Sequence, residues 1–154
     1  MQPFNGNEIS EDTLAAVIIQ IARKNNCKGV TISGGDPFDQ AQSLLKLLKV
    51  LHSEFEDILV YTGFEFADIQ SGLAGTAAKM CLKYLDVLID GEYIDELNFN
   101  DCVLCGSSNQ KIYFIKKELA SIYAEYIEQG RVLESFAHGQ DTIVTGIFNK
   151  EEPR

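Results

Sequence analysis

Gly29-Val-Thr-Ile-Ser-Gly-Gly-Asp-Pro37 is the stretch of sequence that decides the fold. It begins as a short run rich in β-formers, and the two glycines, the aspartate and the proline then end that run in a turn. Upstream of it, apolar residues recur at helical spacing from Leu14 to Ile21, behind Ser10, which is placed to cap a helix. The pattern therefore predicts a helix that ends near residues 25–26, then a strand, then a turn into the next helix.

The same alternation of helix and strand continues toward the C-terminus. Leucines at helical spacing mark a helix over residues 44–51, and Asp57 to Thr62 is apolar at consecutive positions, as in a strand covered on both faces. A helical stretch over residues 65–85, interrupted near 72–75, leads to a third strand at Asp86 to Asp90. Strands separated by helices pair in parallel through right-handed crossovers, and their C-terminal ends are where such a sheet binds ligands.

The sequence pattern after residue 110 predicts a strand, a helix and a terminal hairpin. Lys111 to Ile115 has the pattern of a strand, and apolar residues from Leu119 to Ile127 have the spacing of an amphipathic helix. Two β-rich runs, 131–136 and 142–148, flank a five-residue connection at 137–141 that suits a hairpin. We expect one α/β domain over residues 1–148, with a mostly parallel open sheet or partial barrel, and a polar tail at 149–154.

Composition excludes several classes of function. The chain has 154 residues, of which 45% are hydrophobic, and 13 basic against 23 acidic residues give a net charge of −10. That charge repels phosphate backbones, so we expect no nucleic-acid partner. No apolar run approaches the roughly 20 residues of a membrane span, and the first residues form neither a basic nor an apolar stretch. We therefore expect a cytoplasmic protein with no membrane association.

The four cysteines are better explained as reduced thiols or metal ligands than as a disulfide framework. Cys102 and Cys105 form a CxxC pair, whereas Cys27 falls in a loop and Cys81 in a predicted core. A complete zinc or iron site takes about four protein ligands. We therefore expect no metal site from this chain, with Cys102 and Cys105 the weak candidates, and we expect His52 and His138 to lie at the surface.

Three predicted strands end on polar or glycine-rich sequence, where a parallel sheet exposes a ligand. Gly34 and Gly35 lack a Cβ and allow a polar ligand to approach the backbone, while Asp36 supplies a charge opposite an ammonium or hydroxyl group. Thr62 and Asp90 would face the same crevice. The alternative is purely structural: Asp36 is a good helix N-cap, Pro37 suits the first helical position, and carboxylates and threonines commonly form turns.

Four segments together resemble a known family. Residues 29–38, 58–64, 86–93 and 106–110 resemble, in order and spacing, the activating proteins of anaerobic ribonucleotide reductase, small radical-SAM enzymes related to pyruvate formate-lyase activase. The resemblance runs from about Phe4-Asn-Gly6 to Ile115, with a looser match to Phe148. It implies a partial (β/α) barrel of radical-SAM type in which a 4Fe-4S cluster reductively cleaves S-adenosylmethionine (SAM).

The resemblance also implies a partner and a set of site residues. The partner is a glycyl-radical enzyme, of the anaerobic ribonucleotide reductase or pyruvate formate-lyase type, and the electron donor is a flavodoxin or ferredoxin. Gly34, Gly35 and Asp36 would hold the methionine amino group of SAM. The same cofactor site would include Pro37, Thr62 and Asp90.

The sequence departs from the family pattern in two places. The family holds its cluster with three cysteines in a CxxxCxxC loop, after a first strand that precedes the segment matching Phe4-Asn-Gly6, and this chain starts at Met1 without that strand or loop. The family also commonly carries an aromatic and a basic residue where this chain has Leu104-Cys105. We therefore expect an N-terminally truncated domain in which the cluster is absent.

The sequence leads to one expectation about assembly and to two alternatives for the function. Without the first strand, the strand at residues 29–33 becomes an unprotected edge, so we expect self-association through it. The alternative to an activase is a non-catalytic remnant of the fold that binds a nucleoside, SAM or another protein. A third hypothesis is an unrelated metal-binding protein that uses Cys102 and Cys105.

Overall fold

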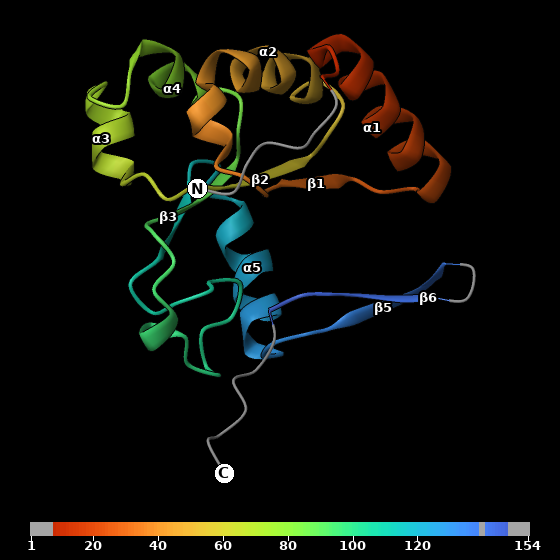
Figure 1. Cartoon of the computed structure of the whole chain (residues 1–154), viewed down its shortest axis with the longest axis vertical. Coiled ribbons are helices and arrows are strands. Elements are labelled where there is room, and N and C mark those ends of the chain that lie inside the picture. Colours follow the sequence, from red (N-terminus) through yellow and green to blue (C-terminus); the bar gives the residue numbers. More distant parts are fainter. Residues whose placement is uncertain (1–7, 139–140, 148–154) are drawn as a thin grey trace.

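The computed structural model describes residues 8–138 and 141–147, and its centre is an open four-stranded sheet (Figure 1). The strands lie in the order β1 (Gly29–Ile32), β2 (Asp57–Tyr61), β3 (Val87–Asp90) and β4 (Lys111–Phe114). β1 and β2 pair in parallel, as do β2 and β3, whereas β4 runs antiparallel to β3. The mostly parallel open sheet is confirmed. The described strands do not close into a barrel, because β1 and β4 each pair with one neighbour in this sheet.

Helices cover both faces of this sheet. They are α1 (Glu11–Asn25), α2 (Ala41–Leu51), α3 (Phe66–Ser71), α4 (Thr76–Cys81) and α5 (Leu119–Glu128), with short 3-10 turns η1 (Pro37–Gln40) and η2 (Asp95–Leu97). Helices α1 to α4 lie on one face and α5 on the other (Figure 1). None of the helices in the described part of the chain is long and apolar enough to cross a membrane.

Local sequence explains where the first helices begin and end. The Ser10 side chain accepts a hydrogen bond from the Thr13 N–H at 3.2 Å, and Asn26 ends α1 in the left-handed conformation with φ 54°. The interruption predicted near residues 72–75 is confirmed, since Gly72 and Gly75 separate α3 from α4 with φ of 91° and 105°. Because a helix needs a φ of about −63°, these positive angles, which glycine adopts readily, prevent one long helix there.

The consecutive apolar residues of the central strands fill two cores. Along β2, Ile58 and Val60 pack in the core beneath α1, α2 and α4, whereas Leu59 packs in a smaller core with Leu119 of α5. β3 alternates in the same way, with Leu88 in the larger core. Side chains alternate between the faces of a strand, so a strand covered on both faces is apolar throughout. This confirms the interpretation of residues 57–62.

The end of the sheet differs from an all-parallel arrangement. The connection from β3 to β4 contains only the short turn η2, and a parallel pairing needs a longer crossover. The chain therefore turns back and β4 pairs with β3 in the antiparallel sense. The following helix α5 is less buried than its spacing predicted, since Ile122 is 60% exposed.

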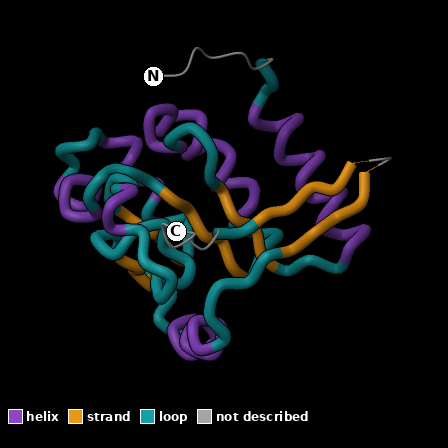
Figure 2. Tube along the Cα trace, turned by 60° about the horizontal axis from the view of Figure 1, so that its bottom comes forward, coloured by secondary structure: helices purple, strands orange, loops and turns teal. Residues whose placement is uncertain are grey.

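The predicted C-terminal hairpin is present and extends closer to its turn than expected. β5 (Glu134–His138) pairs with β6 (Asp141–Thr145), so Ala137, His138 and Asp141 belong to strands and not to the connection. The predicted five-residue connection is thus wrong, because strand pairing continues to His138 and Asp141. Figure 2 shows the hairpin extending away from the four-stranded sheet. The predicted tail at 149–154 and the segment at 4–6 lie outside the described residues.

Candidate functional site

A cavity of about 500 Å³ opens at the C-terminal ends of β1, β2 and β3. Its size lies within the range of small-molecule sites, about 300–1,000 Å³. The lining residues come from the turns after the three parallel strands, from the segment before β4 and from the end of β6: Ser33, Gly34, Asp36, Pro37, Tyr61, Thr62, Gly63, Gly91, Tyr93, Gly106, Gln110, Gly146 and Ile147. Four of the six residues predicted for the site therefore lie together, namely Gly34, Asp36, Pro37 and Thr62. Gly35 and Asp90 are not among the lining residues.

Asp36 links the turn after β1 to the turn after β2. One carboxylate oxygen accepts the N–H of Phe38 at 2.9 Å, which makes Asp36 the N-cap of η1, as the structural interpretation predicted. The other oxygen accepts the N–H of Gly63 at 2.7 Å. The hydroxyl of Thr62 donates to both oxygens, at 2.9 and 3.1 Å. The carboxylate therefore shapes the cavity wall, and its role toward an ammonium group stays a prediction.

The two glycines before Asp36 differ in conformation. Gly34 has a φ of +116°, which L side chains rarely adopt, whereas Gly35 is not in that region. A Cβ added at either position would meet no atom within 4 Å, so the space in front of this backbone is open. A polar ligand can approach the main chain at Gly34 without contact with a side chain there.

Thr62 is held from both sides at the end of β2. Its N–H donates to the carbonyl of Ile89 at 2.9 Å, and its hydroxyl accepts the N–H of Phe64 at 3.1 Å besides donating to Asp36. Thr62 is 5% exposed. The hydroxyl thus donates and accepts hydrogen bonds within the protein. We infer that Thr62 fixes the position of the cavity wall.

Asp90 lies at the end of β3 and faces α3. Its side chain is 1% exposed and accepts the N–H of Phe66, the first residue of α3, at 2.7 Å. The ring of Phe66 stacks on that of Tyr113, with centroids 4.2 Å apart. Burial, the charges of Asp90 and Glu65, and a hydrogen bond with Asp90 raise the pKa of Tyr113. The structure thus places Asp90 beneath a helix terminus, and its predicted contact with a ligand stays a prediction.

The far wall contains residues that sequence reasoning did not single out. The Tyr61 hydroxyl donates to the Leu104 carbonyl at 2.7 Å, and burial raises the pKa of Tyr61 to about 12. The Tyr93 hydroxyl donates to Asp95 at 2.7 Å, and its ring lies against Gly106, where an added Cβ would come within 2.8 Å of it. Both tyrosines fall at the ends of predicted strands and in segments on which the family resemblance rests, and these were the signals available for them.

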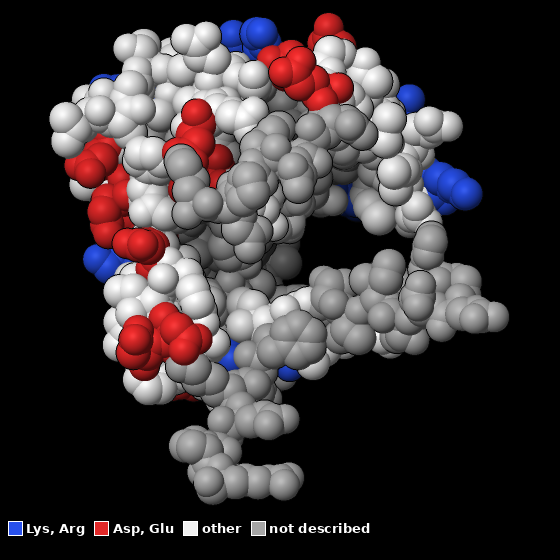
Figure 3. Space-filling view, viewed as in Figure 1, with Lys and Arg blue, Asp and Glu red and all other residues white. Residues whose placement is uncertain are grey.

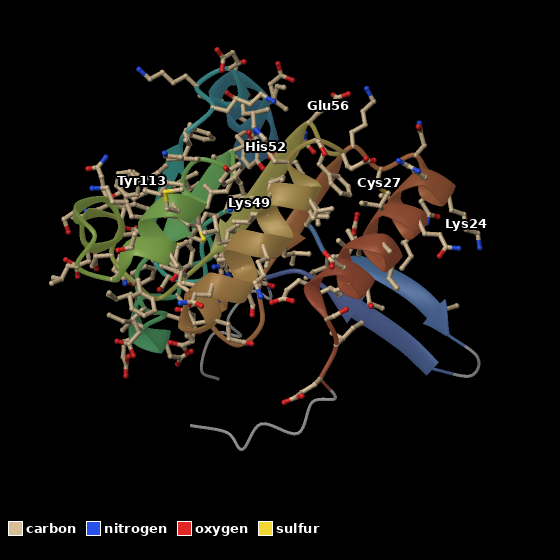
Figure 4. All side chains as sticks on the ribbon, turned by 90° about the horizontal axis from the view of Figure 1, so that it is seen from above. Lys24, Cys27, Lys49, His52, Glu56 and Tyr113 are labelled. Atoms are coloured by element: carbon tan, nitrogen blue, oxygen red, sulfur yellow. The ribbon has the colours of Figure 1, made fainter. Side chains whose placement is uncertain are left out.

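The four thiols of the chain are free. The residues described in the structure contain no group of three or more His, Cys, Asp or Glu that could hold a metal ion. Cys27 is exposed after α1, near Lys24 (Figure 4), and Cys81 is buried in the larger core. Cys102 and Cys105 are free thiols, and burial raises the pKa of Cys105 to about 11. The described side chains therefore do not fit a 4Fe-4S cluster.

His52 lies at the surface, as predicted. It is an exposed residue at the C-terminal end of α2, near Lys49 (Figure 4). Its ring makes an edge-to-face contact with Tyr84, with centroids 5.8 Å apart. For His138 the structure gives only its backbone position in β5.

The surface beside the cavity is acidic. Figure 3 shows Asp and Glu side chains gathered on the side of the molecule that carries α3 and the segment after β3. Glu92, Asp95, Glu96 and Asp101 are exposed in that segment, and residues 84–110 contain no Lys or Arg. The Arg131 guanidinium donates to Asn98 Oδ1 and to the carbonyls of Phe99 and Cys102 in this segment and offsets part of the charge. The remaining negative charge of the rim attracts cationic groups.

Comparisons with known proteins agree on one group of relatives. Residues 1–113 match the family model described as a 4Fe-4S single cluster domain. The chain is 31% identical over 119 residues to the anaerobic ribonucleoside-triphosphate reductase-activating protein of Haemophilus influenzae. The aligned region covers 73% of this chain and 74% of that protein. The protein of the same name from Pasteurella multocida is 33% identical, and the alignment covers 67% of this chain and 67% of that protein. The one from Enterobacteria phage T4 is 30% identical, and the alignment covers 71% of this chain and 67% of that protein. No solved structure matches the chain.

Proposed function

Because the chain belongs to the 4Fe-4S single cluster domain family and, within it, to the anaerobic ribonucleoside-triphosphate reductase-activating proteins, we propose that it is an activase that generates a glycyl radical on a partner enzyme. The observation that carries the proposal is the cavity at the ends of β1 to β3. Two of the segments that resemble the family, with Gly34 and Asp36 in one and Thr62 in the other, meet there. The partner we propose is anaerobic ribonucleotide reductase, with the pyruvate formate-lyase type as the alternative.

The ligand we propose for the cavity is SAM. A volume of about 500 Å³ accommodates a molecule of that size. SAM carries a sulfonium and an ammonium group, and the acidic rim formed by the segment after β3 favours such cations. Open backbone at Gly34 supplies main-chain groups for the polar methionine end of the ligand. These features support a site in which the fold binds and orients SAM.

The cluster of the family would supply the electron that cleaves SAM, drawn from a flavodoxin or ferredoxin. The described side chains do not gather ligands for that cluster, so we assign none of them a role in electron transfer. Their proposed part is to bind SAM, to fix its orientation and to hold the wall of the cavity. Asp36 and Thr62 would do so by joining the ends of β1 and β2.

The binding step is tested by calorimetric titration of the chain with SAM. We expect binding by the wild-type protein and by Asp39→Ala, which removes an exposed carboxylate three residues from Asp36, and at least about tenfold weaker binding by Asp36→Ala. Circular dichroism of each variant shows whether it is folded, and Asp36→Asn is the milder second variant. Equal affinities of wild type, Asp36→Ala and Asp36→Asn would remove this cavity from the proposal.

The chemical step is tested with the reductase partner. If the chain takes up a cluster on anaerobic reconstitution with iron and sulfide, the electron paramagnetic resonance spectrum of the partner should show a glycyl radical after SAM and a reductant are added. SAM binding without any radical would instead support the alternative, a binding module on the same fold.

We also propose that the free edge of β1 pairs with a second copy of this chain. Among the strands that the structure describes, β1 pairs with β2 alone, and its four residues include neither proline nor a charged side chain, the usual protections of an edge. On the adjoining helix α1, Val17 and Ile21 are 43% and 57% exposed. Light scattering should show dimers at micromolar concentration that Thr31→Lys, a charge at this edge, converts to monomers. A wild-type protein that is monomeric throughout would overturn the pairing.

A further inference from the structure

We propose that Gln110 is a positioning residue of the cavity: its side-chain amide holds residues 106–110 against the end of β3 and so fixes the wall that a bound ligand meets. The inference rests on the proposed function for the identity of that ligand, SAM. Gln110 itself, Gly91 and Gly106 all line the cavity. The two segments of the wall are far apart in sequence, and one side chain joins them.

The Gln110 amide uses both of its ends. Its Oε1 accepts the N–H of Gly106 at 2.7 Å and that of Ser107 at 3.3 Å, and its Nε2 donates to the Gly91 carbonyl at 2.7 Å. A primary amide offers an acceptor and a donor on adjacent atoms, which is the combination that this site needs. Neither a carboxylate nor an apolar side chain of equal size provides both.

Neighbouring contacts support the same segment from outside the cavity. The Ser107 hydroxyl accepts the N–H of Ile94 at 3.2 Å, and Asn109 Nδ2 donates to the Glu92 carbonyl at 2.8 Å. Neither Ser107 nor Asn109 is a lining residue. Loss of the Gln110 contacts should therefore loosen the inner wall while these outer contacts keep the segment attached.

The contact at Gly106 connects Gln110 to the mouth of the cavity. Gly106 lies so close to the ring of Tyr93 that a Cβ at that position would approach it to 2.8 Å. The Tyr93 hydroxyl is held by Asp95 and by Asn98, whose Nδ2 donates to it at 3.2 Å. By fixing Gly106, Gln110 also fixes the surface on which the Tyr93 ring rests.

Gln110→Glu tests the donor role of the amide separately from its acceptor role, because it keeps the acceptor and removes the donor. The carboxylate can still accept the N–H of Gly106, but without a proton it faces the Gly91 carbonyl with no donor. Protonation restores that donor, so the pKa of the new carboxyl is raised while the wall is in place. The wall is then intact at low pH and is lost as the pH rises through this raised pKa.

Several titratable groups surround this position. Cys105 lies next to the segment with its Sγ 3.8 Å from the Gln110 carbonyl, Tyr93 packs on Gly106, and Tyr61 holds Leu104. Asp36 lines the same cavity, and Asp90, Glu92 and Lys111 adjoin Gly91 and Gln110 along the chain. These groups are the same in wild type and variant, so the ratio of the two affinities at each pH isolates position 110.

The experiment measures SAM affinity and amide hydrogen exchange at about pH 5 and about pH 8, on either side of the expected raised pKa of a glutamate. For Gln110→Glu we expect affinity nearest to wild type at the lower pH and about tenfold weaker at the higher pH, as for one lost hydrogen bond. The amides of Gly106 and Ser107 should lose their protection from exchange in parallel. Gln129→Glu is the matched control, since Gln129 is exposed and its Nε2 donates to the Glu125 carbonyl of α5 at 3.4 Å.

Gln110→Asn keeps the amide but shortens the side chain, so it should weaken binding and protection at both pH values. A loss in Gln110→Glu that is equal at both pH values, or wild-type behaviour of both variants, would overturn the positioning role. If the wild-type protein binds no SAM at either pH, the proposed function fails. Exchange at Gly106 and Ser107 then still decides the inference about Gln110.

Discussion

The Thr62 hydroxyl donates to the Asp36 carboxylate, at 2.9 Å to one oxygen and 3.1 Å to the other, and joins the end of β2 to the turn after β1. The same carboxylate accepts the N–H groups of Phe38 and Gly63. One side chain thus receives three donors from two segments that lie about 25 residues apart in sequence. The shape of the cavity between these strand ends depends on that connection.

Removing the hydroxyl should measure this connection. We expect Thr62→Val, which keeps the shape of the side chain, to lower the free energy of unfolding by about 1–3 kcal/mol, because it leaves buried groups without a partner. Urea unfolding measures the change, and Thr31→Val at an exposed position of β1 is the control. In a double-mutant cycle with Asp36→Asn, a coupling energy near zero would show that the pair does not act as a unit.

The two glycines before Asp36 should respond differently to the same substitution. Gly34→Ala places a Cβ at φ +116° and should cost about 1–3 kcal/mol of stability, the usual range for such backbone strain. Gly35→Ala has space for a Cβ and no positive φ, so we expect stability within about 0.5 kcal/mol of wild type. Thermal and urea unfolding of both variants make the comparison. Equal losses at the two positions would contradict the assigned conformations.

The sequence predicted most of the fold because its signals are local. The periodic leucines of α2 and the apolar run of β2 each indicate one element, and both elements form where expected. The strand direction of β4 has no local signal, since it depends on the absence of a crossover helix between residues 91 and 110. The C-terminal end of β5 was also predicted wrongly, because its pairing with β6 determines where the strand ends, and the local sequence does not.

The site was predicted in part for the same reason. Asp36 and Thr62 sit where strands end, and the topology of a parallel sheet brings such ends together. Tyr93 and Gln110 enter the cavity wall through tertiary contacts with Gly106 and Gly91, which no spacing in the sequence encodes. Asp90 has the same sequence context as Thr62, yet its carboxylate accepts an N–H of α3. Tertiary packing therefore decides whether a polar side chain at the end of a strand faces the cavity or a neighbouring helix.

The four thiols should react with a thiol reagent in an order set by burial. Burial raises the pKa of Cys81 and of Cys105 to about 11, so little thiolate forms there at about pH 8. Cys27 is exposed and Cys102 is half-buried. We expect alkylation followed by mass spectrometry to show Cys27 modified first, Cys102 next, and the other two only on unfolding. Early modification of Cys105 in the native protein would contradict its burial beside the cavity.

The phenol of Tyr61 should make stability sensitive to alkaline pH. Burial raises its pKa to about 12 in the folded protein, above the value near 10 of an unfolded chain. Folding therefore favours the neutral phenol. The contribution of this phenol to the free energy of unfolding is complete below about pH 10 and is lost as the pH rises through about 12. Urea unfolding at increasing pH should show wild type losing more stability than Tyr61→Phe, which has no proton to lose. Tyr84→Phe, which removes a phenol that packs against the larger core on the other face of the sheet, is the control. Identical pH profiles for wild type and Tyr61→Phe would contradict the burial of the Tyr61 phenol that raises its pKa.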